Sequence, residues 1–167
     1  YFVAGTGFRT HDFSWIEDHI SAGVDATITD VTEQYGTLSL MGPRARDVLQ
    51  TVTATDVGNE AFPFGHVRIV PIAGTDVRAL RVTYVGELGW ELHIPLGKTG
   101  DVFDALMEAG KPYGMRPVGY RALEALRLEK GYRAWGSDVT PEDTPLEAGL
   151  GFAIAAGKDF LGREAID

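Results

Sequence analysis

Three polar side chains have the types and the spacing to fix a flat heteroaromatic ligand. Tyr84 and Glu91 lie on either side of a glycine-bearing turn, and Arg121 lies in the stretch 117–131. The phenol can donate or accept a hydrogen bond, the carboxylate only accepts, and the guanidinium only donates. On rigid elements, the three groups could complement the polar edge of such a ligand. A second interpretation stays open, in which the first two residues mark a solvated hairpin end and Arg121 forms a scaffold ion pair with Glu124 or Glu91.

Two local elements must position these side chains. Residues 81–95 alternate apolar and polar residues, break at two glycines and then alternate again, which predicts a β-hairpin. Residues 117–131 begin with a proline and end at a glycine, the residue types that favour the first turn and the end of a helix. We therefore expect Tyr84 and Glu91 near a hairpin turn and Arg121 in the first turns of a helix.

The remaining pattern predicts an α+β fold. Further helices are expected at residues 13–20, 43–52, 99–109 and from 160 onward, and further strands at 1–4, 24–31, 36–41, 67–71 and 152–155. Helices combined with hairpins favour an antiparallel sheet with helices packed on it over a doubly wound parallel sheet. Two strand–helix groups of similar length suggest a duplicated ferredoxin-like layout, although no sequence repeat supports the duplication.

Composition limits the possible classes of function. The 167 residues, 18.1 kDa, fit one domain with enough bulk for a core. The chain has no cysteine, which excludes disulfides and cysteine metal sites. The net charge of −9 argues against nucleic acid, whose phosphates need clustered lysine and arginine, and no apolar run is long enough to cross a bilayer. We therefore expect neither nucleic acid nor a membrane as a partner.

Other chemistries find no support in the spacing of the residues. The four histidines, at positions 11, 19, 66 and 93, form no ligand pair at workable spacing, so no metal site is expected. No serine lies in a Gly-x-Ser-x-Gly context, and Gly5–Gly7 lacks the further glycine of a dinucleotide-binding turn. His93 shares a strand face with Glu91, which leaves open a supporting role beside that carboxylate.

Several ordered segments resemble a known family, the folate-binding domain of aminomethyltransferase, the T-protein of the glycine cleavage system. The matching segments are 84–91 (YVGELGWE), 119–131 (GYRALEALRLEKG), 144–150 (TPLEAGL) and 160–165 (FLGREA). Residues 8–12 and 128–136 look closer to one branch, the C-terminal folate domain of dimethylglycine and sarcosine dehydrogenases and oxidases. The resemblance covers nearly the whole chain.

The resemblance implies a tetrahydrofolate site and a role for particular residues in it. Carried over by motif position, Glu91 would accept hydrogen bonds from the amino and ring N–H groups of the pterin. Tyr84 would line the same pocket, and Arg121 would hold the ligand by a charge-assisted bond. Val3 falls in a segment that contacts the pterin in the family, and Trp135 takes the place of an aromatic residue near the site. For Trp135 the competing interpretation is packing in the core.

The reaction that the resemblance implies is one-carbon (aminomethyl) transfer, which forms 5,10-methylenetetrahydrofolate. The family's catalytic aspartate lies before the segment that matches residue 1, so no catalytic residue is expected within residues 1–167. The amino-terminal part of the folate domain, the carboxy-terminal barrel domain and any flavin domain would likewise lie outside. We therefore expect a partial folate-binding domain that is inactive alone. The alternative is a non-catalytic folate-binding or scaffold module.

The same resemblance implies the partners of the intact enzyme. Tetrahydrofolate would be the cofactor, a small methylated amine would supply the one-carbon unit, and FAD would bind only in a covalently linked flavin domain. Iron–sulfur assembly relatives are disfavoured, since their Lys-Gly-Cys-Tyr segment corresponds here to Lys130–Tyr132, which has no cysteine. The acidic charge and the absence of a leader favour a cytoplasmic location.

Overall fold

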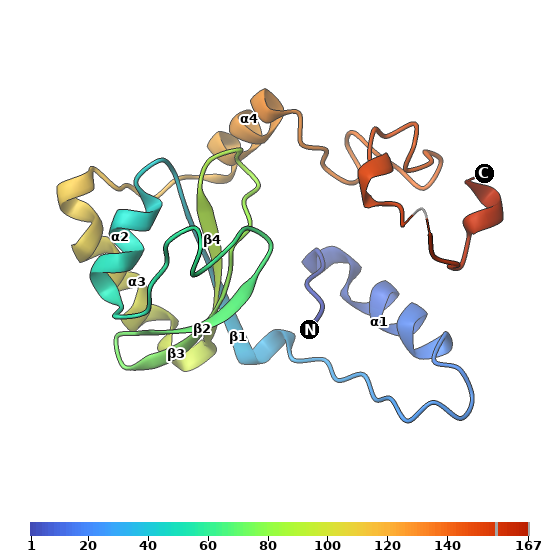
Figure 1. Ribbon diagram of the computed structural model, residues 1–167, viewed down its shortest axis with the longest axis horizontal. Coiled ribbons are helices and arrows are strands. Elements are labelled where there is room, and N and C mark those ends of the chain that lie inside the picture. Colours follow the sequence, from blue (N-terminus) through green and yellow to red (C-terminus); the bar gives the residue numbers. More distant parts are fainter. Residues whose placement is uncertain (156, 167) are drawn as a thin grey trace.

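The centre of the fold is a four-stranded antiparallel sheet with the strand order β1-β4-β3-β2 (Figure 1). The computed structural model describes residues 1–155 and 157–166. The strands are β1 (Tyr35–Met41), β2 (Val67–Ile72), β3 (Thr75–Leu80) and β4 (Gly89–Pro95), and the helices are α1 (Arg9–Asp18), α2 (Ala45–Val52), α3 (Thr99–Gly110) and α4 (Tyr120–Lys130). The α+β class, with helices packed on an antiparallel sheet, is confirmed. The described residues form one such sheet, without a duplicated copy.

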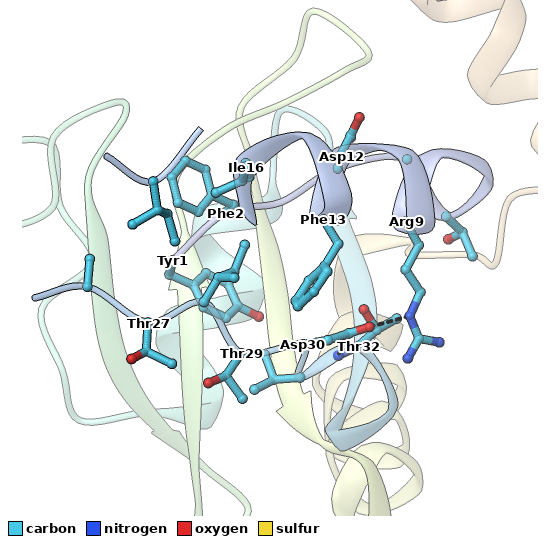
Figure 2. A pocket seen from close by; sticks show the side chains of 17 residues that line it. Tyr1, Phe2, Arg9, Asp12, Phe13, Ile16, Thr27, Thr29, Asp30 and Thr32 are labelled. Carbon is cyan, nitrogen blue, oxygen red and sulfur yellow. Dashed lines mark hydrogen bonds and ion pairs between the residues drawn. The ribbon is translucent and has the colours of Figure 1, made fainter. Parts of the chain in front are cut away.

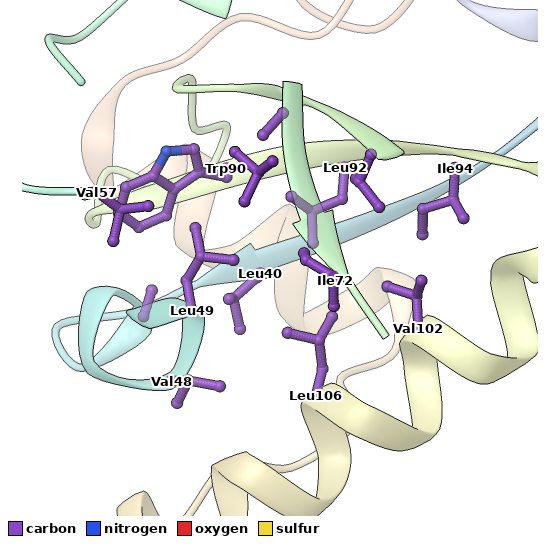
Figure 3. Packing of buried hydrophobic residues seen from close by; sticks show 14 of the residues in the cluster. Leu40, Val48, Leu49, Val57, Ile72, Trp90, Leu92, Ile94, Val102 and Leu106 are labelled. Carbon is purple, nitrogen blue, oxygen red and sulfur yellow. The ribbon is translucent and has the colours of Figure 1, made fainter. Parts of the chain in front are cut away.

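The main core lies between this sheet and the helices α2 and α3. Strand β4 alternates, so that Trp90, Leu92 and Ile94 are fully buried on the face that the two helices cover. Leu49 of α2 and Val102 of α3 meet them there (Figure 3). Burying an aliphatic side chain of this size contributes about 1.5–3 kcal/mol. The helices expected at residues 43–52 and 99–109 therefore form, as α2 and α3, and each buries one side of itself against the sheet.

The segments that flank this core are more open. Helix α1 and the residues that follow it lie beside the sheet rather than in the layer formed by α2 and α3, and α4 leads into an irregular carboxy-terminal segment (Figure 1). Short 3₁₀ helices occur in the described residues at Thr6–Phe8, Thr32–Gln34, Leu96–Lys98, Lys111–Tyr113, Gly151–Ala153 and Arg163–Ala165. Gly131 ends α4 in the left-handed conformation, with φ of 77°, as its position after the helix predicted.

The predicted hairpin at 81–95 is shifted in the structure. Strand β4 pairs with β3 through residues 91–93, while residues 81–88 connect the two strands. Strand β3 pairs along its whole length with β2, and Thr75, Val77 and Ala79 face the core. This alternation buries three side chains and therefore outweighs the weaker pattern of residues 81–85. Tyr84 consequently lies in a connection, not in a strand.

Four other predicted elements differ as well. Residues 1–4 and 24–31 form no strand, and residues 152–155 carry a 3₁₀ turn instead. The helix expected from residue 160 is reduced to one 3₁₀ turn. In the described chain the outer strands β1 and β2 have no further partner, so none of these segments is added to the sheet. A strand-like pattern without a neighbouring strand gains no ladder hydrogen bonds.

Candidate functional site

Glu91 lies on the sheet face opposite α2 and α3. In β4 it stands between two core residues, and its neighbours in register are Ser39 of β1 and Leu80 of β3. About a quarter of its side chain, 26%, is exposed. Within the described residues, Glu91 accepts no hydrogen bond, and the nearest cation-capable atom is Nε2 of His93, 3.9 Å from Oε2. The carboxylate therefore keeps acceptor positions for a ligand.

Aromatic residues cover the same face beside Glu91. The hydroxyl of Tyr1 lies 3.2 Å from Nδ1 of His93, and the two rings meet edge to face. The guanidinium of Arg78 lies 4.3 Å from the centre of the Tyr1 ring and 5.3 Å from that of Tyr35. Cation–π contacts of this kind hold the first residue of the chain against β3 and β4.

Tyr84 is fixed by its hydroxyl in the connection between β3 and β4. The hydroxyl donates a 2.8 Å hydrogen bond to the carbonyl of Arg133, and the ring stacks on Tyr132 with the centroids 6.0 Å apart. Burial raises the pKa of Tyr84, an effect that the charge of Arg127 opposes. At neutral pH the side chain is therefore a neutral phenol whose proton is already committed to the backbone of the segment after α4.

Arg121, the predicted ligand-binding arginine, lies exposed near the start of α4. It makes no hydrogen bond or ion pair with another described residue. The predicted scaffold pairs with Glu124 or Glu91 are not formed. Its guanidinium is thus open to solvent and to a ligand.

Arg127 of α4 is a buried, ion-paired arginine that the sequence analysis did not identify. Only 2% of it is exposed, and it donates to the carbonyl of Tyr132 at 2.9 Å. It forms ion pairs with Glu124, one turn earlier, and with Asp138. The backbone N–H of Ala134 and the Arg127 guanidinium lower the pKa of Asp138. The spacing of Glu124 and Arg127, three residues apart on a helix, was the available signal.

Val3 and Trp135 are both largely exposed. Val3 is 54% exposed, and Trp135 is 55% exposed. The Trp135 ring meets Phe8 edge to face with the centroids 6.4 Å apart, and its backbone bridges to Val139. Trp135 therefore does not pack in the main core, so the competing interpretation for this residue is wrong.

Two cavities lie outside this set of residues. One, of about 450 Å³, lies between α1 and residues 26–32, with Phe13 and Ile16 pointing into it and the ion pair of Arg9 with Asp30 at one end (Figure 2). The backbone N–H of Thr32 and then Arg9 lower the pKa of Asp30 to about 2. The other cavity, of about 730 Å³, is an apolar groove between β1, α3 and α4.

The five predicted site residues do not converge in the described part of the chain. None of them lines either of the two cavities. No hydrogen bond, ion pair or ring contact joins any two of them. Tyr84 is fixed by its hydrogen bond to Arg133, the Glu91 carboxylate accepts no hydrogen bond from a described residue, and Arg121, Val3 and Trp135 are exposed.

Comparison with known proteins identifies the family. The model of the family described as GCVT N-terminal domain matches residues 1–158. The chain belongs to this family. This GCVT domain is 44% identical over its full length to the mitochondrial sarcosine dehydrogenase of Mus musculus, of which it covers 18%. It is 38% identical over 98% of its length to the mitochondrial dimethylglycine dehydrogenase of Homo sapiens, covering 19% of it.

A shorter relative and a solved structure complete the comparison. The GCVT domain is 37% identical over 98% of its length to an aminomethyltransferase of Listeria monocytogenes, and it covers 44% of that protein. The heterotetrameric sarcosine oxidase of Corynebacterium sp. U-96, solved with pyrrole 2-carboxylate, matches 58% of the domain and 49% of that chain with a TM-score of 0.50 at 21% identity, which supports the fold. The domain thus spans about a fifth of the dehydrogenases and under half of the aminomethyltransferase.

The comparison also corrects the expected location. The sarcosine and dimethylglycine dehydrogenases that resemble this domain are named as mitochondrial proteins. The prediction of a cytoplasmic location, which depended on charge and on the start of the sequence, is therefore wrong. Across the described residues, none of the helices has both the length and the apolar character to cross a membrane.

Proposed function

We propose that this domain binds tetrahydrofolate and serves the transfer of a one-carbon unit to it within a longer enzyme. The product would be 5,10-methylenetetrahydrofolate, formed when a folate nitrogen attacks the aminomethyl carbon and the amine departs. The support comes from the family, which includes an aminomethyltransferase and dehydrogenases of two N-methylated glycines. The methylated amine and any flavin would be handled by other parts of that longer enzyme.

The observation that carries the proposal is the open carboxylate of Glu91. It lies on a rigid central strand, it is partly shielded from solvent, and no donor of the described chain occupies its oxygens. The pterin edge offers two neighbouring N–H donors, and a carboxylate matches such a pair with two acceptors. Hydrogen bonds to an ionised acceptor are about twice as strong as neutral ones. The group present therefore fits the ligand.

The other predicted residues would add separate contacts. The guanidinium of Arg121 has no bonded partner among the described residues and can hold an anionic part of the ligand. Val3 and Trp135 present apolar surface that a ring system can cover. Tyr84, whose proton is committed to a backbone carbonyl, would contribute its ring and a lone pair. Because these groups are spread over several elements, residues 1–167 would supply one wall of the pocket, and the catalytic aspartate would come from outside them.

Calorimetric titration with 5-formyltetrahydrofolate tests this proposal. Replacing Glu91 with Gln removes the charge and one acceptor, and we expect binding about ten- to a hundredfold weaker than in the parent chain, or roughly 1–3 kcal/mol. Glu60→Gln, at an exposed glutamate in the loop before β2, is the matched control and should bind like the parent. Quenching of the three tryptophans gives a second readout.

The possible results separate the alternatives. Equal binding by the parent and by Glu91→Gln would show that this carboxylate does not hold the pterin. Absence of binding in the parent would contradict a folate site formed by this chain. Binding by the intact enzyme without formation of the methylene product would favour the non-catalytic folate-binding module.

A further inference from the structure

His93 is a buried histidine beside Glu91, the carboxylate that is proposed to bind the ligand. It is 5% exposed, although it lies on the sheet face opposite the main core. Its two ring nitrogens have different surroundings. Nδ1 lies 3.2 Å from the hydroxyl of Tyr1, whereas Nε2 is buried and makes no hydrogen bond to any residue that the structure describes. A buried nitrogen without a partner is costly, about 1–3 kcal/mol, so its position requires an explanation.

The groups at its two ring nitrogens point to one tautomer of His93. Its partners in register are Arg78 on β3 and Thr37 on β1, and Oε2 of Glu91 lies 3.9 Å from Nε2. A neutral imidazole has one donor nitrogen and one acceptor nitrogen. When the Tyr1 hydroxyl donates to Nδ1, the proton of the ring lies on Nε2. The ring is then held at one end by Tyr1 and has a free N–H at the other.

The free N–H of His93 faces the carboxylate of Glu91. Nε2 of His93 is 3.9 Å from Oε2 of Glu91, and within the described residues no other polar group approaches that carboxylate as a bonded partner. A hydrogen bond between these two atoms requires a separation of about 2.7–3.2 Å, so it forms when the glutamate side chain moves closer to the ring. The ionised carboxylate has about four lone-pair positions, so it can accept from His93 and still accept from two ligand donors.

We propose that His93 is the positioning residue of Glu91, acting through an Nε2–H···Oε2 hydrogen bond with Tyr1 fixing the tautomer. The role of this bond in ligand binding rests on the proposed function, because it presumes that Glu91 receives the pterin. His93 does not touch the ligand. It restricts the carboxylate to the rotamer whose outer lone pairs face away from β4, and it removes the cost of the unpaired buried nitrogen.

Two conservative variants distinguish positioning from packing. In His93→Gln the amide nitrogen can take the place of Nε2, which keeps the donor to Glu91. In His93→Asn the amide reaches only the position of Nδ1, which keeps a partner for Tyr1 and loses the donor. We expect His93→Asn to bind 5-formyltetrahydrofolate about fivefold more weakly and His93→Gln to bind within twofold of the parent. Equal weakening in both variants would overturn the positioning role.

Imidazole ¹⁵N NMR of the full chain tests the hydrogen bond without any ligand. At neutral pH the His93 signals, identified by their loss in His93→Gln, should show a proton on Nε2 and a bare Nδ1. Glu91→Gln should shift the Nε2 signal and leave those of the other three histidines unchanged. A proton on Nδ1, or an Nε2 signal unaffected by Glu91→Gln, would overturn the proposal. A parent chain that binds no folate but shows the expected NMR pattern would instead contradict only the proposed function.

Discussion

At the residue scale, the buried guanidinium of Arg127 holds the segment after α4 in place. Removing one of its acids leaves a buried charge with incomplete compensation, which is usually strongly destabilising. We expect Asp138→Asn to lower the melting temperature at pH 7 by about 5 °C or more. Circular dichroism melts measure the change. Asp104→Asn, at an exposed position on α3, is the matched control and should melt like the parent.

The same substitution has a predictable dependence on pH. The pKa of Asp138 is lowered in the folded chain by the Ala134 N–H and by Arg127. Its ionised form therefore stabilises the fold above the unfolded pKa of about 4, and this contribution disappears as the pH falls through the lower folded pKa. The difference in melting temperature between the parent and Asp138→Asn should shrink below about pH 4. A difference that is the same at pH 3 and at pH 7 would contradict this assignment.

Individual residues also show what the sequence could predict about the site. Glu91 and Tyr84 were identified because a local motif marks them, and the alternation of β4 placed Glu91 on its face. The shared strand face left a supporting role for His93 open, but its contact with Tyr1 required the fold, as did the ion pair of the buried Arg127 with Asp138. The local pattern does not connect these residues to each other.

At the element scale, the contact between β1 and β4 depends on a glycine. A Cβ on Gly89 would lie 2.7 Å from Cγ of Met41 and 2.9 Å from the carbonyl oxygen of Leu40. Because a backbone atom is among these neighbours, we expect Gly89→Ala to lower the free energy of unfolding by about 1–3 kcal/mol. Urea unfolding measures it. Gly100→Ala, on α3 with nothing within 4 Å, should instead raise stability, by up to about 1 kcal/mol.

If Gly89→Ala unfolds at the same urea concentration as the parent, that result would contradict the inference that β1 and β4 approach too closely at residue 89 for a Cβ. A loss in Gly100→Ala as well would point to a general sensitivity to substitution instead. The opposite signs expected for two glycine-to-alanine changes make the pair informative, since the added methyl group is the same in both.

The elements were predictable where their signals are local. Helices α2 and α3 and strand β1 lie where spacing predicted them, with ends that differ by a few residues. The helix expected from residue 117 begins at Tyr120, since Gly119 is still extended with ψ of 164°. Strand pairing was less predictable than the elements themselves, because β3 pairs with β2 through burial against α2 and α3, which the local sequence does not show. As a result, residues 81–88 form a connection rather than the first strand of a hairpin.

At the scale of the whole molecule, buried apolar side chains are concentrated in one part of the chain. The main core consists of residues between Leu40 and Leu106, whereas α1 contributes no buried residue. Regions with few buried apolar contacts open at lower free energy than the core. We therefore expect amide hydrogen exchange to be slowest in β1, β3 and β4 and much faster in α1 and in residues 145–155. Exchange monitored by NMR in the full chain measures both regions in one experiment.

Two matched substitutions decide whether these regions open independently. Leu92, fully buried in β4, sets global stability, so Leu92→Ala should speed exchange throughout the sheet by an amount that corresponds to about 2–5 kcal/mol. Phe13, which lines the cavity beside α1, should affect only its own segment, so Phe13→Ala should leave the exchange of β4 unchanged. Faster exchange of β4 in Phe13→Ala would mean that the two parts unfold as one unit. Independent opening, by contrast, would mean that Tyr1, which contacts His93, can leave the sheet without unfolding it, so that access to the face of Glu91 depends on the less stable part of the molecule.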